Sequence, residues 1–128
     1  MRLSRPYLAL IAAAGTLGLP APAAAHHGGG VEWQSQVVGP LTGIVVEFAF
    51  RFPHVVIYLD VAGENGQPQR WAMNTRWTPT ILRQHGWKRD SVKPGDMVTV
   101  IYQPHVASPT VGNMVTIEVN GETLPLDF

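Results

Sequence analysis

Histidine is the residue type in this chain best suited to chemistry, because the sequence holds five histidines and no cysteine. His26 and His27 are adjacent and directly follow Ala25, the last residue of a predicted leader. Once the leader is removed, the free amino group and imidazole of His26 form a bidentate copper ligand, since an α-amino group with a pKa of about 7.7–8.0 releases its proton to a metal near neutrality. The alternative is that the two histidines only follow the cleavage site and bind nothing.

His54 and His105 are the candidates for completing such a metal site from the folded domain. Each follows a proline, which stiffens the backbone that presents the imidazole. We expect them in the connections between strands one and two and between strands four and five, on one rim of a barrel and within about 10 Å of each other. The pattern predicts a transition-metal site, copper by preference, formed by His26, His27, His54 and His105. The alternative for His54 and His105 is a strand-end role, in which the ring bonds a backbone group.

The remaining reactive residue types are interpreted structurally. His85 is expected in the last turn of a short helix, where a positive imidazole interacts favourably with the helix dipole. Trp71 and Met73 share one face of a strand and are similar to the Cu(I) sites of some exported copper carriers, but core packing is the preferred interpretation. The sequence contains no serine-nucleophile elbow, zinc-protease helix or phosphate-binding glycine loop, so it predicts a binding protein and not an enzyme.

The first 25 residues have the pattern of a secretory leader. Arg2 and Arg5 precede an apolar run over residues 7–19, and residues 23–25 are the small alanines of a cleavage site. We therefore expect a periplasmic or secreted protein in which residues 1–25 are removed, residues 26–38 are a flexible His/Gly-rich lead-in, and residues 39–128 form one domain. Removal leaves 103 residues, enough for a single modest core.

Composition narrows the range of partners. Without the leader, seven basic and nine acidic residues give a net charge of −2 with neutral histidines. That balance argues against a nucleic acid or an anionic membrane as partner, since both attract a basic face. No second apolar run reaches about 18 residues, so no membrane span is expected after cleavage. The absence of cysteine excludes disulfides and thiolate chemistry.

Hydrophobic alternation predicts a mainly β domain. Strands are expected over residues 41–50, 55–61, 69–74, 97–103 and 113–119, with a short edge over 122–126. Thr78 and Pro79 predict the start of one short helix that ends near Gly86. The order β-β-β-α-β-β is typical of a small five-stranded OB-like barrel, and the alternative is an open sheet with the helix on one face. The expected core consists of the alternating apolar residues Ile44, Val46, Phe48, Ile57, Leu59, Val98, Val100, Val115 and Ile117.

Two segments of the chain resemble one family of small exported bacterial proteins. They are Arg51-Phe52-Pro53-His54 and the run Gly86-Trp87-Lys88-Arg89-Asp90-Ser91-Val92-Lys93-Pro94-Gly95-Asp96. The chain is similar, over nearly the whole mature region, to the family catalogued as domain of unknown function 6152. The family pattern has Asn in place of Phe52, Glu in place of Arg70 and Leu in place of Val92. The resemblance implies the fold and the export, and it implies no activity.

The leading hypothesis is a small periplasmic binding protein that holds copper or another transition metal through histidines. The alternative is a metal-free accessory module that binds a protein, peptide or glycan on the face of the barrel. The two hypotheses differ in what they require of His54 and His105. Convergence of the two rings favours the metal, and placement at opposite ends of the barrel favours the module.

Overall fold

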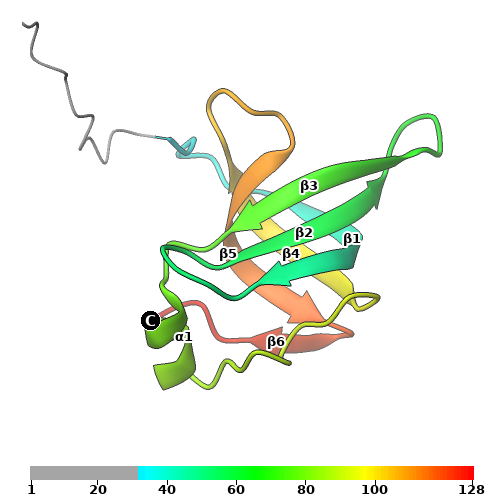
Figure 1. Cartoon of the computed structure of the whole chain (residues 1–128). Helices are drawn as coiled ribbons and strands as arrows, with labels where there is room; N and C mark the ends of the chain where they lie inside the picture. Colours follow the sequence, from blue (N-terminus) through cyan, green and yellow to red (C-terminus); the bar gives the residue numbers. More distant parts are fainter. Residues whose placement is uncertain (1–31) are drawn as a thin grey trace, which may run out of the picture.

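The structure is a computed structural model that describes residues 32–128, so the predicted leader, His26 and His27 lie outside the described residues. Its elements are β1 (Val38–Ala49), β2 (Val56–Ala62), β3 (Pro68–Asn74), α1 (Pro79–Gln84), β4 (Met97–Pro104), β5 (Val111–Val119) and β6 (Glu122–Leu124). Neighbouring strands in the order β3-β2-β1-β4-β5-β6 are antiparallel, and a parallel pairing of β3 with β5 closes the first five strands into a barrel (Figure 1). The prediction of a mainly β, five-stranded closed barrel with one short helix is confirmed, and the open sheet is wrong.

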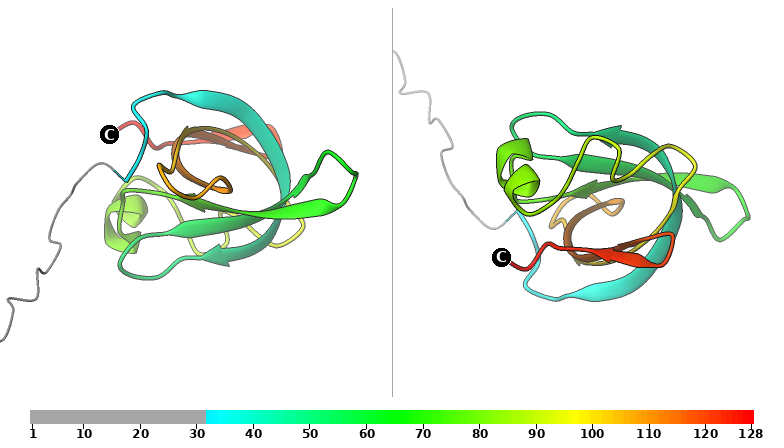
Figure 2. Two further views of the ribbon diagram at one scale, coloured as in Figure 1. Left: turned by 90° about the horizontal axis from the view of Figure 1, so that it is seen from above. Right: turned by 90° about the horizontal axis from the view of Figure 1, so that it is seen from below.

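Barrel closure depends on the absence of a side chain at Gly112. This residue pairs with Met73 across the β3–β5 contact and with Pro104 across the β4–β5 contact. A Cβ atom at Gly112 would collide with the ring of Tyr102 and lie 3.0 Å from the sulfur of Met73. Glycine therefore lets three strands approach closely where the barrel shuts, and Figure 2 shows the enclosed interior from above and below.

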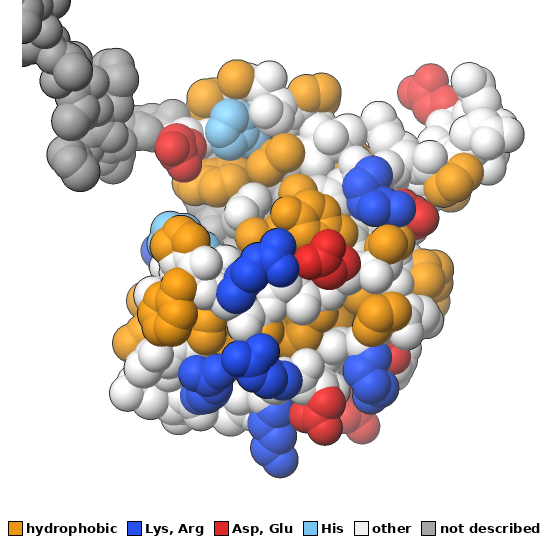
Figure 3. Space-filling model, viewed as in Figure 1, with side chains coloured by type: hydrophobic (Ala, Val, Ile, Leu, Met, Phe, Trp, Pro, Cys, Tyr) orange, Lys and Arg blue, Asp and Glu red, His pale blue; other side chains and the backbone are white. Residues whose placement is uncertain are grey.

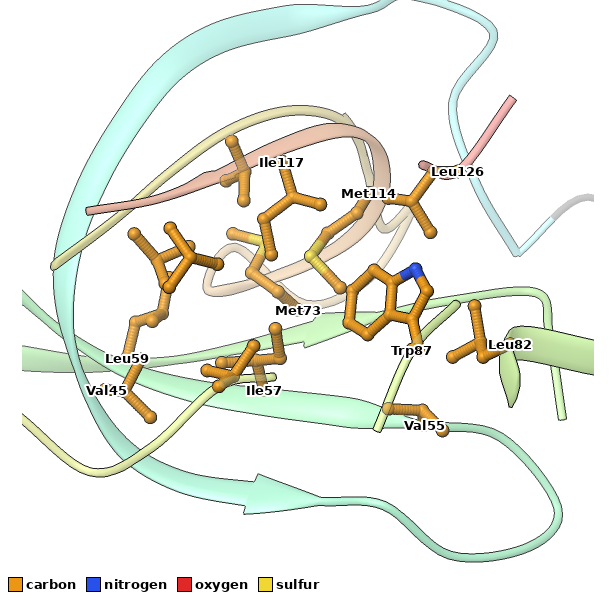
Figure 4. Close-up of a cluster of buried hydrophobic side chains, with 14 of the residues drawn as sticks. Val45, Val55, Ile57, Leu59, Met73, Leu82, Trp87, Met114, Ile117 and Leu126 are labelled. Atoms are coloured by element: carbon orange, nitrogen blue, oxygen red, sulfur yellow. The ribbon is translucent and has the colours of Figure 1, made fainter. Parts of the chain in front are cut away.

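The core fills the inside of the barrel (Figure 4). Five of the predicted core residues are fully buried, namely Ile57, Leu59, Val98, Val100 and Ile117. Ile44 is a wrong prediction, since its side chain is 46% exposed while the neighbouring Val45 is 2% exposed. The reason is a register shift between Val45 and Glu47, which reverses the inward face of β1 part-way along the strand. Strict alternation counted back from Phe48 therefore assigns Ile44 to the inside of the barrel, although Val45 occupies it.

A similar shift affects β5. The register of β4 against β5 changes between Ile101 and Tyr102, and Met114 is buried where alternation predicts Val115, which is only partly buried. Two predicted core positions, Val46 and Val115, thus lie in the barrel wall and not in its centre. The strands themselves are predicted correctly, and the core residues are misplaced because the pairing register shifts within β1 and β5.

The helix begins and ends as its sequence predicts. The Thr78 side chain accepts a hydrogen bond from the N–H of Ile81, and Pro79 follows at the first helical position. Gly86 has a φ of +90°, and the N–H of Trp87 donates to the carbonyl of Leu82 over 3.0 Å, which closes the helix end. No helix within residues 32–128 is long and apolar enough to cross a membrane.

Two tryptophans on either side of α1 fasten the C-terminal segment to the barrel. The indole N–H of Trp87 donates to the carbonyl of Pro125 over 2.7 Å, and that of Trp77 donates to the carbonyl of Leu126 over 3.3 Å. Leu126 is buried in the same core. The helix is consequently held at the end of the barrel where the connection between β1 and β2 also lies (Figure 1).

Candidate functional site

His105 lies where β4 turns into β5, and its ring is occupied by the turn. Its Nδ1 accepts hydrogen bonds from the N–H groups of Ala107 and Ser108, each over 3.0 Å. Its own backbone N–H donates to the carbonyl of Val111 over 2.9 Å. A metal bound at Nδ1 would displace both donors, and a metal at Nε2 would require a proton on Nδ1, facing them. The strand-end interpretation therefore describes this histidine.

The chain that precedes β1 reinforces the same turn. Trp33 forms an isolated antiparallel bridge with His105, and the two rings meet edge to face with centroids 5.3 Å apart. The N–H of Gln34 donates to the carbonyl of Pro104, and the N–H of Val106 donates to the carbonyl of Glu32. The described part of the predicted lead-in is thus paired with the β4–β5 connection.

His54 has different surroundings, in the connection between β1 and β2. Its side chain is exposed. The next residue, Val55, is buried and exchanges backbone hydrogen bonds with the chain after β3, from its N–H to the carbonyl of Trp77 and from the N–H of Thr75 to its carbonyl. His54 is therefore presented to solvent on a firmly anchored backbone, next to the chain that leads into α1.

The structure does not bring His54 and His105 together. β1 is antiparallel to both β2 and β4, so the connection after β1 and the connection after β4 leave from opposite ends of β1. Val38, at the start of β1, pairs with Tyr102 near His105, whereas Ala49, at its end, pairs with Val56 near His54. The path around the closed barrel, through β3 and β5, leads to the same result, because His54 precedes the paired end of β2 and His105 follows the paired end of β4 in the opposite direction. The prediction that they share one rim is wrong.

No other described group replaces the predicted metal site. Within residues 32–128, no three His, Cys, Asp or Glu side chains are grouped so as to hold a metal ion. His85 caps the C-terminal end of α1, and its ring stacks on Phe128 with centroids 3.5 Å apart. Met73 is fully buried, and Trp71 packs edge to face on Tyr102, so the core interpretation of that pair holds.

The outer face of β2 and β3, which the module hypothesis would use, is polar and largely paired with itself. Tyr58 lies opposite Ala72 of β3 and Glu47 of β1. On the same two strands, the Arg70 Nε lies 2.6 Å from an Asp60 carboxylate oxygen, and this hydrogen bond raises the pKa of Arg70. The charges on this face are already compensated, which leaves little to attract a charged partner.

A more distinctive surface lies around His54. We call it the basic end, and it consists of the exposed side chains Arg51, Phe52, Arg76, Arg83, Lys88 and Arg89. The β1–β2 connection, which carries Arg51 and Phe52, and α1, which carries Arg83, lie side by side in both views of Figure 2. The guanidinium of Arg83 lies 5.0 Å from the ring centroid of Phe50, a direct contact between the two segments.

Charge is unevenly distributed between the two ends of the barrel. Residues 47–55, 75–90 and the C-terminal segment 125–128, which is bound beside α1, contain five Lys or Arg and three Asp or Glu, a local net charge of +2 from side chains. The segments at the other end, residues 32–37, 63–69 and 104–111, contain Glu32 and Glu64 and no Lys or Arg. Figure 3 shows basic side chains gathered over the lower part of the face it displays, around α1 and the chain that follows it.

Most of these cations lack a partner in the described part of the chain. Ion pairs within residues 32–128 are limited to Arg51 with Glu47, at 3.1 Å, and Arg70 with Asp60. Arg83, Lys88 and Arg89 accordingly have no carboxylate within 4.0 Å among the described residues. An incoming anion would meet these charges uncompensated.

Phe52 adds an apolar group to the basic end. Its side chain is 65% exposed, the highest fraction among the large hydrophobic residues of the described chain. The four residues from Arg51 to His54 are all exposed, between the buried anchors Phe50 and Val55. The tip therefore projects from the barrel.

The net charge of the chain does not reveal this surface. A net charge of zero for the whole chain, or −2 without the predicted leader, indicates no basic face, yet residues 76–93 alone contain five Lys or Arg and one acidic residue. A charge count by segment would have detected this imbalance. Only the fold shows that Arg51 and Phe52 join it.

Comparison with known proteins identifies a family and nothing closer. No curated protein and no solved structure matches the chain. A family model, described as "Family of unknown function (DUF6152)", matches residues 15–114, which is most of the chain and includes both segments that carry the resemblance noted from the sequence. The chain therefore belongs to this family.

Proposed function

We propose that the protein is an exported OB-like interaction module, not an enzyme, that works without a metal ion and docks an anionic partner on its basic end. The observation that carries this proposal is the segregation of charge, with a local side-chain charge of +2 around the β1–β2 connection and α1 in a chain whose net charge without the predicted leader is −2. Such clustering has an electrostatic cost in the free protein, because like charges repel, and it attracts an oppositely charged surface.

The arrangement of the histidines supports the metal-free half of the proposal. His105 already accepts two hydrogen bonds at Nδ1, and His54 lies at the other end of β1. A transition-metal ion needs several nitrogen ligands about 2.0–2.1 Å away at the same time, and rings at opposite ends of β1 are poorly placed to supply them together. We therefore favour the metal-free module over a copper site built on His54 and His105.

Calorimetry with Cu(II) tests this half directly. The protein should be purified after export, with its native N-terminus and no tag, and compared with His54→Ala and His105→Ala. We expect each substitution to change the Cu(II) affinity by less than about twofold, since an ion bound by an N-terminal histidine would not need either ring. A loss of about tenfold or more in both variants would show that the two rings converge on one ion.

Binding of an anionic peptide tests the docking half. A fluorescein-labelled deca-glutamate peptide is a simple anionic probe, and anisotropy reports its binding. The double variant Arg83→Gln/Arg89→Gln removes two positive charges from the basic end, and Gln67→Glu/Gln69→Glu lowers the net charge equally at the β2–β3 hairpin. Docking at the basic end predicts that only the first variant weakens binding, by about tenfold at low salt. Equal weakening by both variants would indicate a general charge effect and contradict the proposal.

A further inference from the structure

We propose that the anionic partner is a phospholipid surface, and that the protein docks on it with Phe52 inserted among the headgroups and the surrounding cations on the lipid phosphates. This inference rests on the proposed function, since it names the partner of the same basic end. It differs from the proposal of a generic anionic partner because it assigns a role to Phe52, which charge alone does not explain.

The position of Phe52 carries the argument. A folded domain normally covers a phenyl ring, yet this one is 65% exposed between residues whose side chains are exposed too. Its loop is not loose, because Phe50 and Val55 on either side are buried in the core cluster. An aromatic ring held outward on a fixed loop suits the boundary between lipid headgroups and acyl chains, where aromatic and basic side chains bind together.

The shape of the basic end favours a bilayer over a peptide. Peptides bind in grooves, where pockets receive their side chains. The cavity of about 310 Å³ beside Trp77 and Phe128 includes Arg76 but neither Phe52 nor Arg83. A second cavity, of about 420 Å³, lies under the β2–β3 hairpin and includes no residue of the basic end. The exposed Phe52 projects from the barrel, as an inserting group must.

The cations are placed to accompany that insertion. Arg51 is adjacent to Phe52 in the chain, and Arg83 lies against Phe50 at the base of the same loop. Lys88 and Arg89 follow the buried Trp87, which holds them beside α1. Each Lys or Arg near an anionic bilayer raises its affinity about fivefold, and the effect falls off within a Debye length. Arg83, Lys88 and Arg89 together therefore give measurable binding that salt abolishes.

Two substitution pairs separate the apolar and charged contributions. Co-sedimentation with vesicles of phosphatidylglycerol and phosphatidylethanolamine measures the partition coefficient of the exported protein. We expect Arg83→Gln/Arg89→Gln to lower it about 25-fold and Gln67→Glu/Gln69→Glu by less than threefold. Phe52→Ser should lower it about tenfold, while Val106→Ser, at a side chain 55% exposed on the opposite end, should leave it unchanged.

A site-specific label reports insertion directly. Because the chain contains no cysteine, a single Phe52→Cys substitution accepts one environment-sensitive nitrobenzoxadiazole dye, and Val106→Cys provides the matched control. Vesicles should increase the emission of the dye at position 52 about twofold and leave that at position 106 unchanged. Circular dichroism of each variant confirms that the barrel is folded.

The outcomes distinguish this inference from the proposed function. Vesicle binding with a response at position 52 supports both. Binding of the deca-glutamate peptide without vesicle binding overturns the lipid inference and keeps the proposed function, with an acidic polypeptide as partner. Binding to neither probe overturns both. Equal binding to phosphatidylcholine vesicles, or vesicle binding with a response only at position 106, overturns the assigned docking surface.

Discussion

The chain contains two Pro-His dipeptides, and the barrel treats them in opposite ways. His105, after Pro104, receives two backbone hydrogen bonds on its ring and an edge-to-face contact from Trp33. His54, after Pro53, is exposed at the other end of β1. The same two residues thus stabilise a turn in one place and lie on an exposed tip in the other. Their neighbours in space, and not the dipeptide, decide which.

The difference extends to the two ends of the barrel as a whole. The His105 end is fastened by chain from three regions, namely the segment before β1, the end of β4 and the start of β5. The basic end is also anchored, by the buried residues Phe50 and Val55, but its polar and aromatic side chains are exposed. Rigidity with enclosed side chains favours a structural role, whereas rigidity with exposed side chains favours binding.

The largest expected effect contrasts one glycine at each end. Gly112→Ala should destabilise the protein by about 3 kcal/mol, because its Cβ would collide with the Tyr102 ring where the barrel closes. Gly86→Ala, after α1, should cost only about 1 kcal/mol, since its Cβ meets open space and only the positive φ is unfavourable. Urea unfolding measures both values. A larger loss for Gly86→Ala would mean that the His105 end is not the more tightly packed of the two.

The next contrast removes each histidine. His105→Ala should cost about 1–2 kcal/mol, since two backbone N–H groups lose their acceptor and Trp33 loses its aromatic partner. His54→Ala should change the free energy of unfolding by less than about 0.5 kcal/mol, because its side chain is exposed. Thermal unfolding at neutral pH checks both. Similar losses in the two variants would remove the distinction drawn between the two ends.

The smallest effect concerns acid sensitivity on the barrel wall between the ends. The Asn120 side chain and the backbone N–H of Lys93 both donate to the Asp96 carboxylate, and they lower its pKa, the Asn120 bond more strongly. A lowered folded-state pKa adds stability that is present above the ordinary value of about 3.9 and is lost as the pH falls through the folded-state value. Asp96→Asn should therefore weaken the protein at pH 6 by less than about 1 kcal/mol and flatten its stability profile between pH 4 and 2, with Asp90→Asn as the control. An unchanged profile would mean that these bonds do not persist in solution.

Much of the fold follows from local sequence signals. Thr78, Pro79 and Gly86 predict the helix because capping depends on residues only a few positions apart. The pair Pro94-Gly95 is typical of a tight turn for the same local reason, and Gly95 has a φ of +91°. Ile44 was misplaced because a bulge depends on the partner strand, which alternation along one strand does not describe.

The site was less predictable, for a related physical reason. Whether His54 meets His105 depends on the directions of β1, β2 and β4 together, which the order of strands along the chain does not give. At the basic end, the fold brings together residues that the sequence keeps apart. Arg51 and Arg83 are far apart in the sequence and meet only through the packing of Arg83 on Phe50. The net charge of the whole chain does not show such a cluster, because acidic residues elsewhere cancel it in the sum.

A residue-resolved binding map tests the central claim, that the exposed basic end and not the fastened histidine end meets the partner. Backbone amide NMR signals of the protein without residues 1–25 should be followed during titration with bicelles that contain phosphatidylglycerol. The account predicts shifts concentrated in residues 51–54 and 83–89, reversed by 0.5 M salt, and none in residues 104–108. Shifts centred on His105 and Val106, or spread equally over both ends, would contradict it.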